Sequence, residues 1–322
     1  MLRQVFAFLC CCISLLAQGA EDPQGRNWLE RMSQALSARN YEGRFVHMNE
    51  LRTETMRIIH RSVDGAVTER LVALDGSGRE IVRTDGEVTC YLPDKKTVLI
   101  TKRSDKDKRS LVANLPIYSD ELQSLYEISM GTSSKLLGRP TQLVNVQPRD
   151  EFRYGYKLWL DAETAMPLKS QLSDRQGHVV EQMAFAEIEM RDSIAPEDLK
   201  PTVDTQGFRR LVQEAASTTT ANNTGGWSVV KLPPGFRLTI TRIQFMAGSG
   251  AQVQHMVYSD GLASVSVFIE PKPAQAMHGL GRVGSASAYS IDLNGHQITA
   301  VGEVPPVTVE SIATAVAPAE RH

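Results

Sequence analysis

The fold is decided by residues 51–102, which have the sequence LRTETMRIIHRSVDGAVTERLVALDGSGREIVRTDGEVTCYLPDKKTVLITK. Asp-Gly pairs occur at residues 64–65, 75–76 and 85–86, and the segments between them are rich in Val, Ile, Leu and Thr. Asp-Gly favours the tight turns of antiparallel hairpins, and turns at this spacing are typical of consecutive hairpins. The stretch therefore predicts a β-meander with strands at residues 51–62, 66–74, 79–84, 87–92 and 97–102.

One face of this meander is apolar. Met56 and Ile58 occupy alternate positions of one predicted strand, as Leu71 and Ala73 do in the next, so each pair points to one side of its strand. An apolar face must be covered, and the roughly helical spacing of apolar residues in 116–130 predicts a covering helix. The covered space is either a solid core or a hollow that accepts lipid, where each buried CH₂ gains roughly 0.8 kcal/mol. If the space is a hollow that accepts lipid, we expect Met56, Ile58, Leu71 and Ala73 to line it.

The regions on either side of the meander complete a large α+β domain. Residues 27–40 carry apolar side chains at helical spacing, with Asn27 as the expected N-cap. Further strands are predicted at residues 141–147, 154–160, 168–174 and 179–189. The chain therefore combines one long antiparallel sheet with few helices.

Composition changes between residues 201 and 226. The segment 217–226, STTTANNTGG, is small, polar and uncharged, which predicts a flexible linker. Beyond it, strands are predicted at residues 227–231, 236–246, 253–259, 263–269 and 285–293, followed by a closing helix at 307–316. We therefore divide the chain into a large domain at residues 21–204, a linker at 205–226 and a small β-rich domain at 227–322.

Residues 1–20 have the layout of a secretory signal peptide. Arg3 precedes an apolar run at residues 5–17, and the small residues Gly19 and Ala20 follow it. The run is shorter than the ~20 residues needed to cross a bilayer. We predict export and cleavage near Gly19 or Ala20, which leaves Cys90 as the one cysteine of the mature chain. A single cysteine excludes an internal disulfide and a zinc site built on thiolates.

Composition and motifs point away from nucleic acid and from catalysis. The 35 Lys and Arg residues against 37 Asp and Glu give a net charge of −2, which does not attract the chain to nucleic acid. Nucleophile-elbow, zinc-protease and phosphate-loop motifs are missing. Gly279, Gly281 and Gly284 match G-x-G-x-x-G but precede an expected strand, so we interpret them as a glycine-rich loop. We predict no catalytic residue, no metal and no cofactor, although recruited carboxylates leave an enzyme as an alternative.

Basic residues gather where the meander ends. A solvated loop surface is one interpretation, and a docking patch for phosphate-bearing lipid or an acidic partner is the other, with each basic residue contributing on the order of 1 kcal/mol near an anionic surface. For the docking patch we name Lys102, Arg103, Lys106, Lys108 and Arg109.

Four groups of segments carry a family resemblance: NWL at 27–29 with YEGRFV at 41–46, RIIHR at 57–61 with ERL at 69–71 and LDG at 74–76, YKLWLD at 156–161, and GEVP at 302–305. Together they resemble the MucB/RseB family of periplasmic regulators of the envelope-stress sigma factor. The resemblance covers nearly the whole mature chain. The Leu-Trp-Leu-Asp element is also shared with LolA- and LolB-like lipoprotein carriers.

The resemblance implies a periplasmic protein that is not an enzyme. Its large domain would be an open antiparallel half-barrel covered by helices, similar to LolA and LolB. The protein would bind the periplasmic domain of a MucA/RseA-type anti-sigma factor and shield it from site-1 proteolysis. Lipid or lipopolysaccharide fragments would release that partner. The sequence leaves both a monomer and a homo-oligomer open.

The small domain is expected to take a major part in holding the anti-sigma factor. We name Phe245, Met256, Tyr258 and Val265 as candidate partner-binding residues, because interface energy concentrates in apolar and aromatic anchors. Ordinary core residues are the alternative interpretation of these four. The alternative function is a periplasmic lipid or lipoprotein carrier of LolA/LolB type, and the sequence features of the two domains do not separate it from the regulator.

Overall fold

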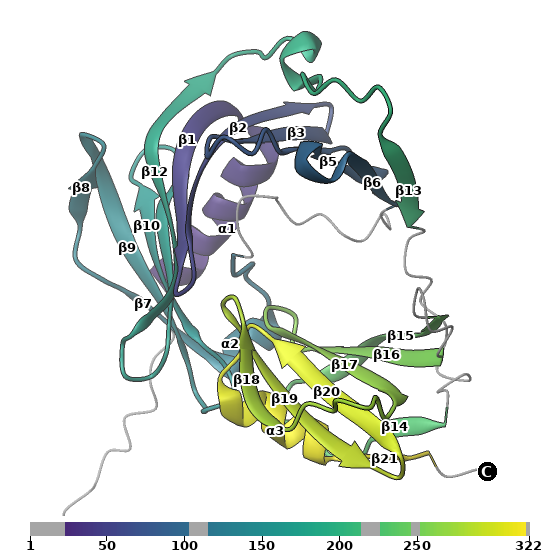
Figure 1. Ribbon diagram of the computed structural model, residues 1–322. Coiled ribbons are helices and arrows are strands. Elements are labelled where there is room, and N and C mark those ends of the chain that lie inside the picture. Colours follow the sequence, from purple (N-terminus) through teal and green to yellow (C-terminus); the bar gives the residue numbers. More distant parts are fainter. Residues whose placement is uncertain (1–22, 103–114, 214–225, 246–251, 320–322) are drawn as a thin grey trace, which may run out of the picture.

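The computed structural model describes residues 23–102, 115–213, 226–245 and 252–319, which form a large curved sheet and a smaller sheet below its opening (Figure 1). The large sheet contains thirteen of the described strands, in the order β13-β6-β5-β4-β3-β2-β1-β12-β11-β10-β9-β7, with β8 paired to β9. Its strands are β1 (Asn40–Asn49), β2 (Thr53–Val63), β3 (Ala66–Ala73), β4 (Glu80–Arg83), β5 (Glu87–Leu92), β6 (Thr97–Lys102), β7 (Tyr126–Met130), β8 (Ser134–Leu136), β9 (Arg139–Pro148), β10 (Gly155–Asp161), β11 (Pro167–Ser173), β12 (Val179–Arg191) and β13 (Arg209–Gln213).

The predicted meander is confirmed, since β2 to β6 are consecutive antiparallel neighbours with ends within two residues of expectation. The turn between β2 and β3 shows why the spacing was informative. Asp64 and Gly65 both have positive φ, 52° and 82°, as the mirror-image turn of a two-residue hairpin requires.

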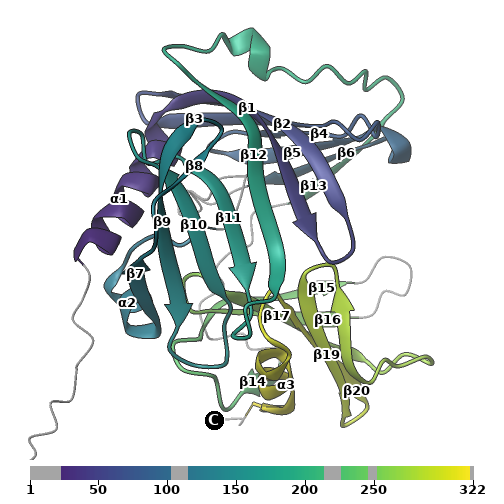
Figure 2. The same ribbon diagram turned by 90° about the vertical axis from the view of Figure 1, so that its left-hand side faces the viewer.

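Helix α1 (Pro23–Ala38) lies inside the curve of the large sheet (Figures 1 and 2). Its residues Leu29 and Met32 are fully buried against strands β7, β9 and β10, and Ala35 packs against β1 and β2. The helix begins at Pro23 and not at Asn27, because proline's restricted φ suits a first helical turn and Asn27 is a solvent-exposed residue within the helix. Within the described ranges, no helix is long and apolar enough to cross a bilayer.

The covering helix expected at residues 116–130 is wrong in extent. Helix α2 spans only Asp120–Leu125, where the Ser119 hydroxyl accepts a hydrogen bond of 3.1 Å from the Leu122 amide at its N-terminus. After Leu125 the apolar side chains alternate, so residues 126–130 continue as strand β7 beside β9. Apolar residues therefore recur at helical spacing only up to Leu125, and from residue 126 they recur at every second position, as in a strand.

Part of the expected linker belongs to the large sheet. Residues 200–208 follow a short 3₁₀ turn at Pro196–Leu199, and β13 then pairs in parallel with β6 at the sheet edge. Hence the described residues 209–213 are an edge strand. The remaining residues, 214–225, lie outside the description.

The small sheet has the order β15-β16-β17-β20-β19-β18, and α3 covers one of its faces. The G-x-G-x-x-G segment is not a loop but forms strand β18 and the turn into β19, since Gly281 pairs with Ala288 and Gly284 has a φ of 65°. The elements are β15 (Arg237–Phe245), β16 (Gln252–Ser259), β17 (Ser264–Pro271), β18 (Gly279–Val283), β19 (Ala286–Leu293), β20 (His296–Gly302) and α3 (Pro306–Thr314), with a separate pair formed by β14 (Trp227–Val229) and β21 (Val316–Pro318). The predicted α+β fold, an open large sheet with a separate small sheet, is therefore confirmed.

Candidate functional site

The four residues named as lipid lining lie together on the concave face of the large sheet. Met56 stands opposite Ala73, and Ile58 stands opposite Leu71, in the register of β2 and β3. All four are buried, and Met56, Ile58 and Leu71 belong to one cluster with Ala35 of α1 and Phe45 of β1. In this arrangement the side chains around them form a packed core, and lipid could reach them only if neighbouring segments moved.

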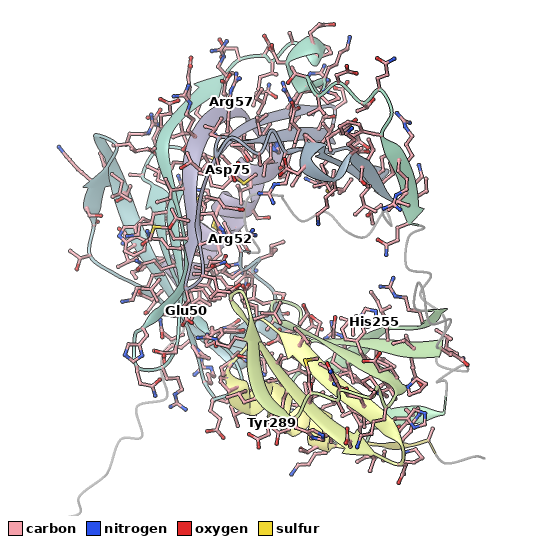
Figure 3. All side chains as sticks on the ribbon, in the orientation of Figure 1. Glu50, Arg52, Arg57, Asp75, His255 and Tyr289 are labelled. Carbon is pink, nitrogen blue, oxygen red and sulfur yellow. The ribbon has the colours of Figure 1, made fainter. Side chains whose placement is uncertain are left out.

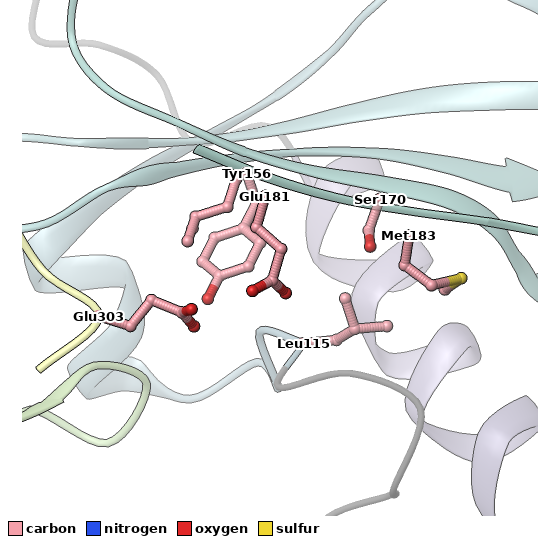
Figure 4. Close-up of a pocket in the computed structure, with 7 residues that line it drawn as sticks. Leu115, Tyr156, Ser170, Glu181, Met183 and Glu303 are labelled. Carbon is pink, nitrogen blue, oxygen red and sulfur yellow. The ribbon is translucent and has the colours of Figure 1, made fainter. Parts of the chain in front are cut away.

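A small cavity lies further along the same concave side, where the small sheet meets the large one (Figure 4). Its volume is about 10 Å³, which is close to the space that one water molecule needs and far below that of an acyl chain. The lining combines apolar and acidic side chains. It consists of Leu115, Tyr156, Ser170, Leu172, Glu181, Met183 and Glu303.

The basic residues named at the end of the meander are described only in part. Lys102 is exposed at the end of β6, where its ammonium group lies 2.6 Å from the Glu87 carboxylate. Arg103, Lys106, Lys108 and Arg109 lie outside the described residues. Their role in lipid docking stays a prediction.

Three of the four residues named for partner binding face the interior of the small domain. Met256, Tyr258 and Val265 are buried in one cluster with Val309 and Ile312 of α3. Phe245 ends β15, and its side chain lies outside the description. In this arrangement Met256, Tyr258 and Val265 are core residues of the small domain, and they are not available to a partner.

The large and small domains are joined at a buried arginine that the sequence did not single out. Arg153, in the loop between β9 and β10, has a fully buried side chain. Its Nη2 donates a hydrogen bond of 2.5 Å to the Pro234 carbonyl, and its Nε lies 3.3 Å from the carboxylate of Asp260 in the small domain. The guanidinium also lies over the ring of Phe236, 5.4 Å from its centroid.

Asp260 is held at this junction by groups from both domains. Burial raises the pKa of its carboxyl, against the opposing effects of backbone hydrogen bonds from Leu262 and Ala263 and of the Arg153 charge. Nearby, the Thr308 hydroxyl of α3 donates a hydrogen bond of 2.7 Å to the Phe152 carbonyl. The β9–β10 loop thus anchors the small domain by two adjacent residues.

A second junction contains His47, Glu181 and Glu303, which we call the interface cluster. Glu181 belongs to β12 of the large sheet, and Glu303 follows β20 of the small sheet. The two carboxyl groups both line the cavity and point toward one another at its edge (Figure 4). His47 Nε2 lies 3.2 Å from Glu181, and the Ser285 hydroxyl donates to Glu303.

The acid–base properties of the interface cluster follow from its crowding. Burial and the neighbouring Glu181 carboxylate raise the pKa of Glu303 to about 7. Burial also opposes ionisation of Glu181, but its hydrogen bonds with His47 and Glu303 lower its pKa overall. The hydrogen bond with Glu181 raises the pKa of His47. One proton is therefore shared between two carboxyl groups beside an imidazole that tends to be charged.

The GEVP segment, singled out by sequence, builds this junction. Gly302 has no room for a side chain, because a Cβ there would lie 2.5 Å from the Ser264 carbonyl oxygen. Glu303 then reaches Glu181, while the Val304 carbonyl accepts a hydrogen bond of 2.7 Å from Ser287. Pro305 precedes the first turn of α3. The sequence marked this segment only by its family resemblance and did not indicate its contact with the other domain.

The RIIHR and ERL segments supply His60 and Glu69 to a different ionic group, which we call the buried triad and which Arg83 of β4 completes. Glu69 accepts hydrogen bonds from both partners, at 2.9 Å each, and all three side chains are almost fully buried. Burial opposes ionisation of Glu69, but His60 and Arg83 outweigh it and lower its pKa to about 2. The Tyr41 ring stacks on His60 with centroids 4.6 Å apart. His60 and Glu69, which belong to the segments that carry the family resemblance, therefore lie in a buried ionic group of the large sheet.

Chemically, the described residues offer binding surfaces and ion pairs. In that part of the chain no group of three or more His, Cys, Asp or Glu side chains is placed to hold a metal ion. Cys90 is half-buried, and burial raises the pKa of its thiol, which favours the unreactive form.

Comparison with protein families gives matches to both parts of the chain. Residues 24–203 match the MucB/RseB N-terminal domain, and residues 221–317 match the MucB/RseB C-terminal domain. The sigma factor AlgU regulatory protein MucB of Pseudomonas aeruginosa is 33% identical over 304 residues, covering 91% of this chain and 90% of that protein. The sigma-E factor regulatory protein RseB of Escherichia coli strain K12 is 26% identical over 302 residues, covering 92% of each.

Solved structures give the same result at the level of the fold. The complex of Pseudomonas aeruginosa MucA and MucB contains a chain that superposes with a TM-score of 0.73 at 30% identity, covering 92% of this chain and 100% of that one. A structure of MucB in complex with MucA(peri) gives a TM-score of 0.70 at 30% identity, covering 92% and 99%. The similarity extends over both sheets.

Proposed function

Because the chain belongs to the MucB/RseB family, we propose that it is a periplasmic negative regulator of an envelope-stress sigma factor. In this role it binds the periplasmic domain of a MucA/RseA-type anti-sigma factor and protects it from site-1 proteolysis. The observation that carries the proposal is a match along both domains to relatives named as sigma factor regulators. The solved complexes of MucB with MucA support the same class of partner.

The domain interface supports a regulator that changes shape. Besides the buried Arg153 junction and the packing of Leu262 against the core of the large domain, it contains exposed ion pairs. The Arg282–Glu50 ion pair joins β18 to the turn after β1, where Figure 3 places Glu50 beside the small sheet. Arg237 lies 3.7 Å from Glu121, and both side chains are more than half exposed. Exposed pairs of this kind contribute at most about 1 kcal/mol each, so they hold the two domains together less firmly than the buried Arg153 junction does.

Release of the anti-sigma factor by lipid or lipopolysaccharide fragments is the second part of the proposal. Lipid would enter at Met56, Ile58, Leu71 and Ala73, with the basic residues 102–109 near its phosphate groups. Since the four apolar residues are packed in this structure, entry requires the concave face to open. If lipid and partner prefer different arrangements of the domains, each lowers the affinity for the other by the same factor.

A protease-protection assay tests the proposal. The periplasmic segment of the anti-sigma factor from the same genome is incubated with its site-1 protease, with and without this protein. We expect cleavage to slow when the protein is present, and to recover when lipopolysaccharide fragments are added. A lipid or lipoprotein carrier would neither bind the segment nor slow its cleavage, so that outcome would favour the alternative function.

Replacement of the basic residues separates the two ligands. We expect combined replacement of Lys102, Arg103, Lys106, Lys108 and Arg109 by Ser to weaken capture of lipopolysaccharide fragments and to leave binding of the anti-sigma segment unchanged. A matched control replaces Lys95 and Lys96, which lie outside this group. Unchanged lipopolysaccharide capture would remove residues 102–109 from the mechanism.

A further inference from the structure

The interface cluster holds an unbalanced set of charges between the two domains. Glu181 comes from β12, Glu303 from the end of β20, and His47 from β1, so two groups belong to the large domain and one to the small. Two carboxyl groups face one imidazole in a half-buried space. If both carboxyl groups are ionised, like charges repel across the junction in a medium of reduced dielectric.

Two further titratable groups belong to the surroundings. The Tyr156 phenol of β10 lines the same cavity, and burial raises its pKa, so it stays neutral at any ordinary pH. Glu54 of β2 adds a negative charge near His47, but it is itself bound to Arg79 at 3.2 Å. Ser285 contributes a hydroxyl donor to Glu303 and carries no charge. The charge of the junction therefore changes mainly through Glu303 and His47.

We propose that Glu181 and Glu303 form a proton-dependent clasp between the large and small domains. The clasp is closed when one proton is shared by the two carboxyl groups and His47 is charged, because the cluster then has no net charge. It opens when the proton leaves and His47 becomes neutral, because two adjacent carboxylates then face each other across the junction.

The remaining contacts decide what opening means. Arg153 and Thr308 tie the small domain to the β9–β10 loop through buried contacts that contain no group of the clasp. Near the clasp, the exposed Arg282–Glu50 pair is the weaker kind of contact. Loss of the clasp therefore turns the small domain about the Arg153 junction and leaves both domains folded. Its consequence for partner release rests on the proposed function, whereas the clasp itself does not.

The directions of the pKa changes agree with this geometry. The pKa of Glu303 is raised to about 7, and the pKa of His47 is raised as well. Both groups therefore keep their protons to a higher pH than usual, and they lose them as the medium becomes more alkaline. Each loss makes the cluster more negative. Both changes therefore act in the same direction on the junction, which sharpens the response to pH.

Fluorescence energy transfer between the two domains tests the clasp without any partner. Dyes are attached at Asp94→Cys in the large domain and Ala274→Cys in the small domain, both exposed positions, on a Cys90→Ser background. We expect transfer efficiency to change reversibly between about pH 5.5 and about pH 8.5, a range that spans the ordinary His pKa. Far-ultraviolet circular dichroism should stay constant over the same range, because neither domain unfolds.

Two variants and a control make the test specific. Glu303→Gln keeps a hydrogen-bonding side chain without a charge, and we expect it to hold the closed transfer efficiency across the range. His47→Gln removes the positive neighbour, which should move the transition to higher pH. Glu127→Gln, an exposed glutamate on β7, is the control and should behave like the unmodified protein. The proposal is overturned if the unmodified protein shows no transition, or if Glu303→Gln and His47→Gln both retain it unchanged.

Discussion

The buried triad and the interface cluster are built from similar side chains and behave in opposite ways. In each, a histidine ring nitrogen lies about 3 Å from a glutamate, at 2.9 Å for His60–Glu69 and 3.2 Å for His47–Glu181. The third member is Arg83 in the triad and a second carboxyl group, Glu303, in the cluster. The triad therefore lowers the pKa of its glutamate, and the cluster raises that of Glu303.

The difference shows how the sign of one neighbouring charge separates a structural ion group from a group that responds to pH. Arginine keeps its charge at any physiological pH, so Glu69 always has a fixed positive charge beside it. A second carboxyl group must share a proton, so the interface cluster changes charge near neutrality. The triad lies within one sheet, whereas the cluster lies between two domains.

The largest expected effect comes from breaking the triad. Glu69→Gln leaves the His60 and Arg83 side chains buried without their carboxylate, and we expect a loss of about 3–5 kcal/mol in the free energy of unfolding. Urea denaturation at neutral pH measures it. The control is Glu87→Gln, which removes an exposed pair with Lys102 and should cost at most about 1 kcal/mol. Equal losses for the two variants would show that the triad carries no special stability.

The Arg153 junction is expected to show the next largest effect. Arg153→Met leaves Asp260 buried beside an apolar side chain, and we expect a loss of about 2–3 kcal/mol, less than for the triad because the raised pKa of Asp260 lets it take up a proton. Urea denaturation measures the loss. Arg149→Met, an exposed change in the same loop, should alter stability by less than about 0.5 kcal/mol. A loss within that range for Arg153→Met would contradict a central role for this residue.

The pH dependence of stability distinguishes the two groups by sign. Glu303 has a folded-state pKa above its unfolded value, so its contribution is complete below about pH 4, near the ordinary Glu pKa, and is lost as pH rises through its folded pKa of about 7. Glu69 has a lowered pKa, so its contribution is present above that ordinary value and is lost as pH falls toward about 2.

Removal of each group should therefore flatten a different side of the stability profile. We expect Glu303→Gln to be more stable than the unmodified protein at alkaline pH, by about 1–2 kcal/mol, and the stability of Glu69→Gln to depend less steeply on pH in the acid range. Thermal denaturation over a series of buffers measures both profiles. If the Glu303→Gln profile falls on the alkaline side as steeply as that of the unmodified protein, Glu303 is not the group that titrates.

The smallest effect is expected at the surface. Lys102→Ala breaks an exposed ion pair with Glu87, and we expect a change in stability within about 0.5 kcal/mol. Differential scanning calorimetry measures it, with Lys135→Ala, an exposed residue of β8, as the control. A loss comparable to that of Arg153→Met would mean that the end of β6 has structural contacts beyond this pair.

Sequence reasoning succeeded where the decisive interactions are local. The hairpins of β2 to β6 were predicted within two residues, because Asp-Gly turns and alternating side chains involve neighbouring positions. It failed at 126–130, where apolar residues fit a helix and a strand equally well until β9 provides a pairing partner. It also left Met256, Tyr258 and Val265 as either anchors or core, since burial depends on the position of α3.

The candidate site was less accessible to the same reasoning. His47 and Glu181 had no spacing that linked them, and Arg153 stood among other charged residues of a loop. Glu303 was noticed only as part of the GEVP segment. Fully buried charged residues such as Arg153 give no signature in the sequence, because their partners come from distant segments.

The sequence by itself determined the meander, the two β-rich regions and the family to which the chain belongs. Each depends on turn residues, alternation and short motifs that act over a few neighbouring positions. Only the tertiary structure decided that Glu181 meets Glu303, and that Arg153 is buried between the domains. Such contacts depend on how the two sheets pack against each other. That packing involves many side chains from distant parts of the chain, so no short sequence pattern predicts it.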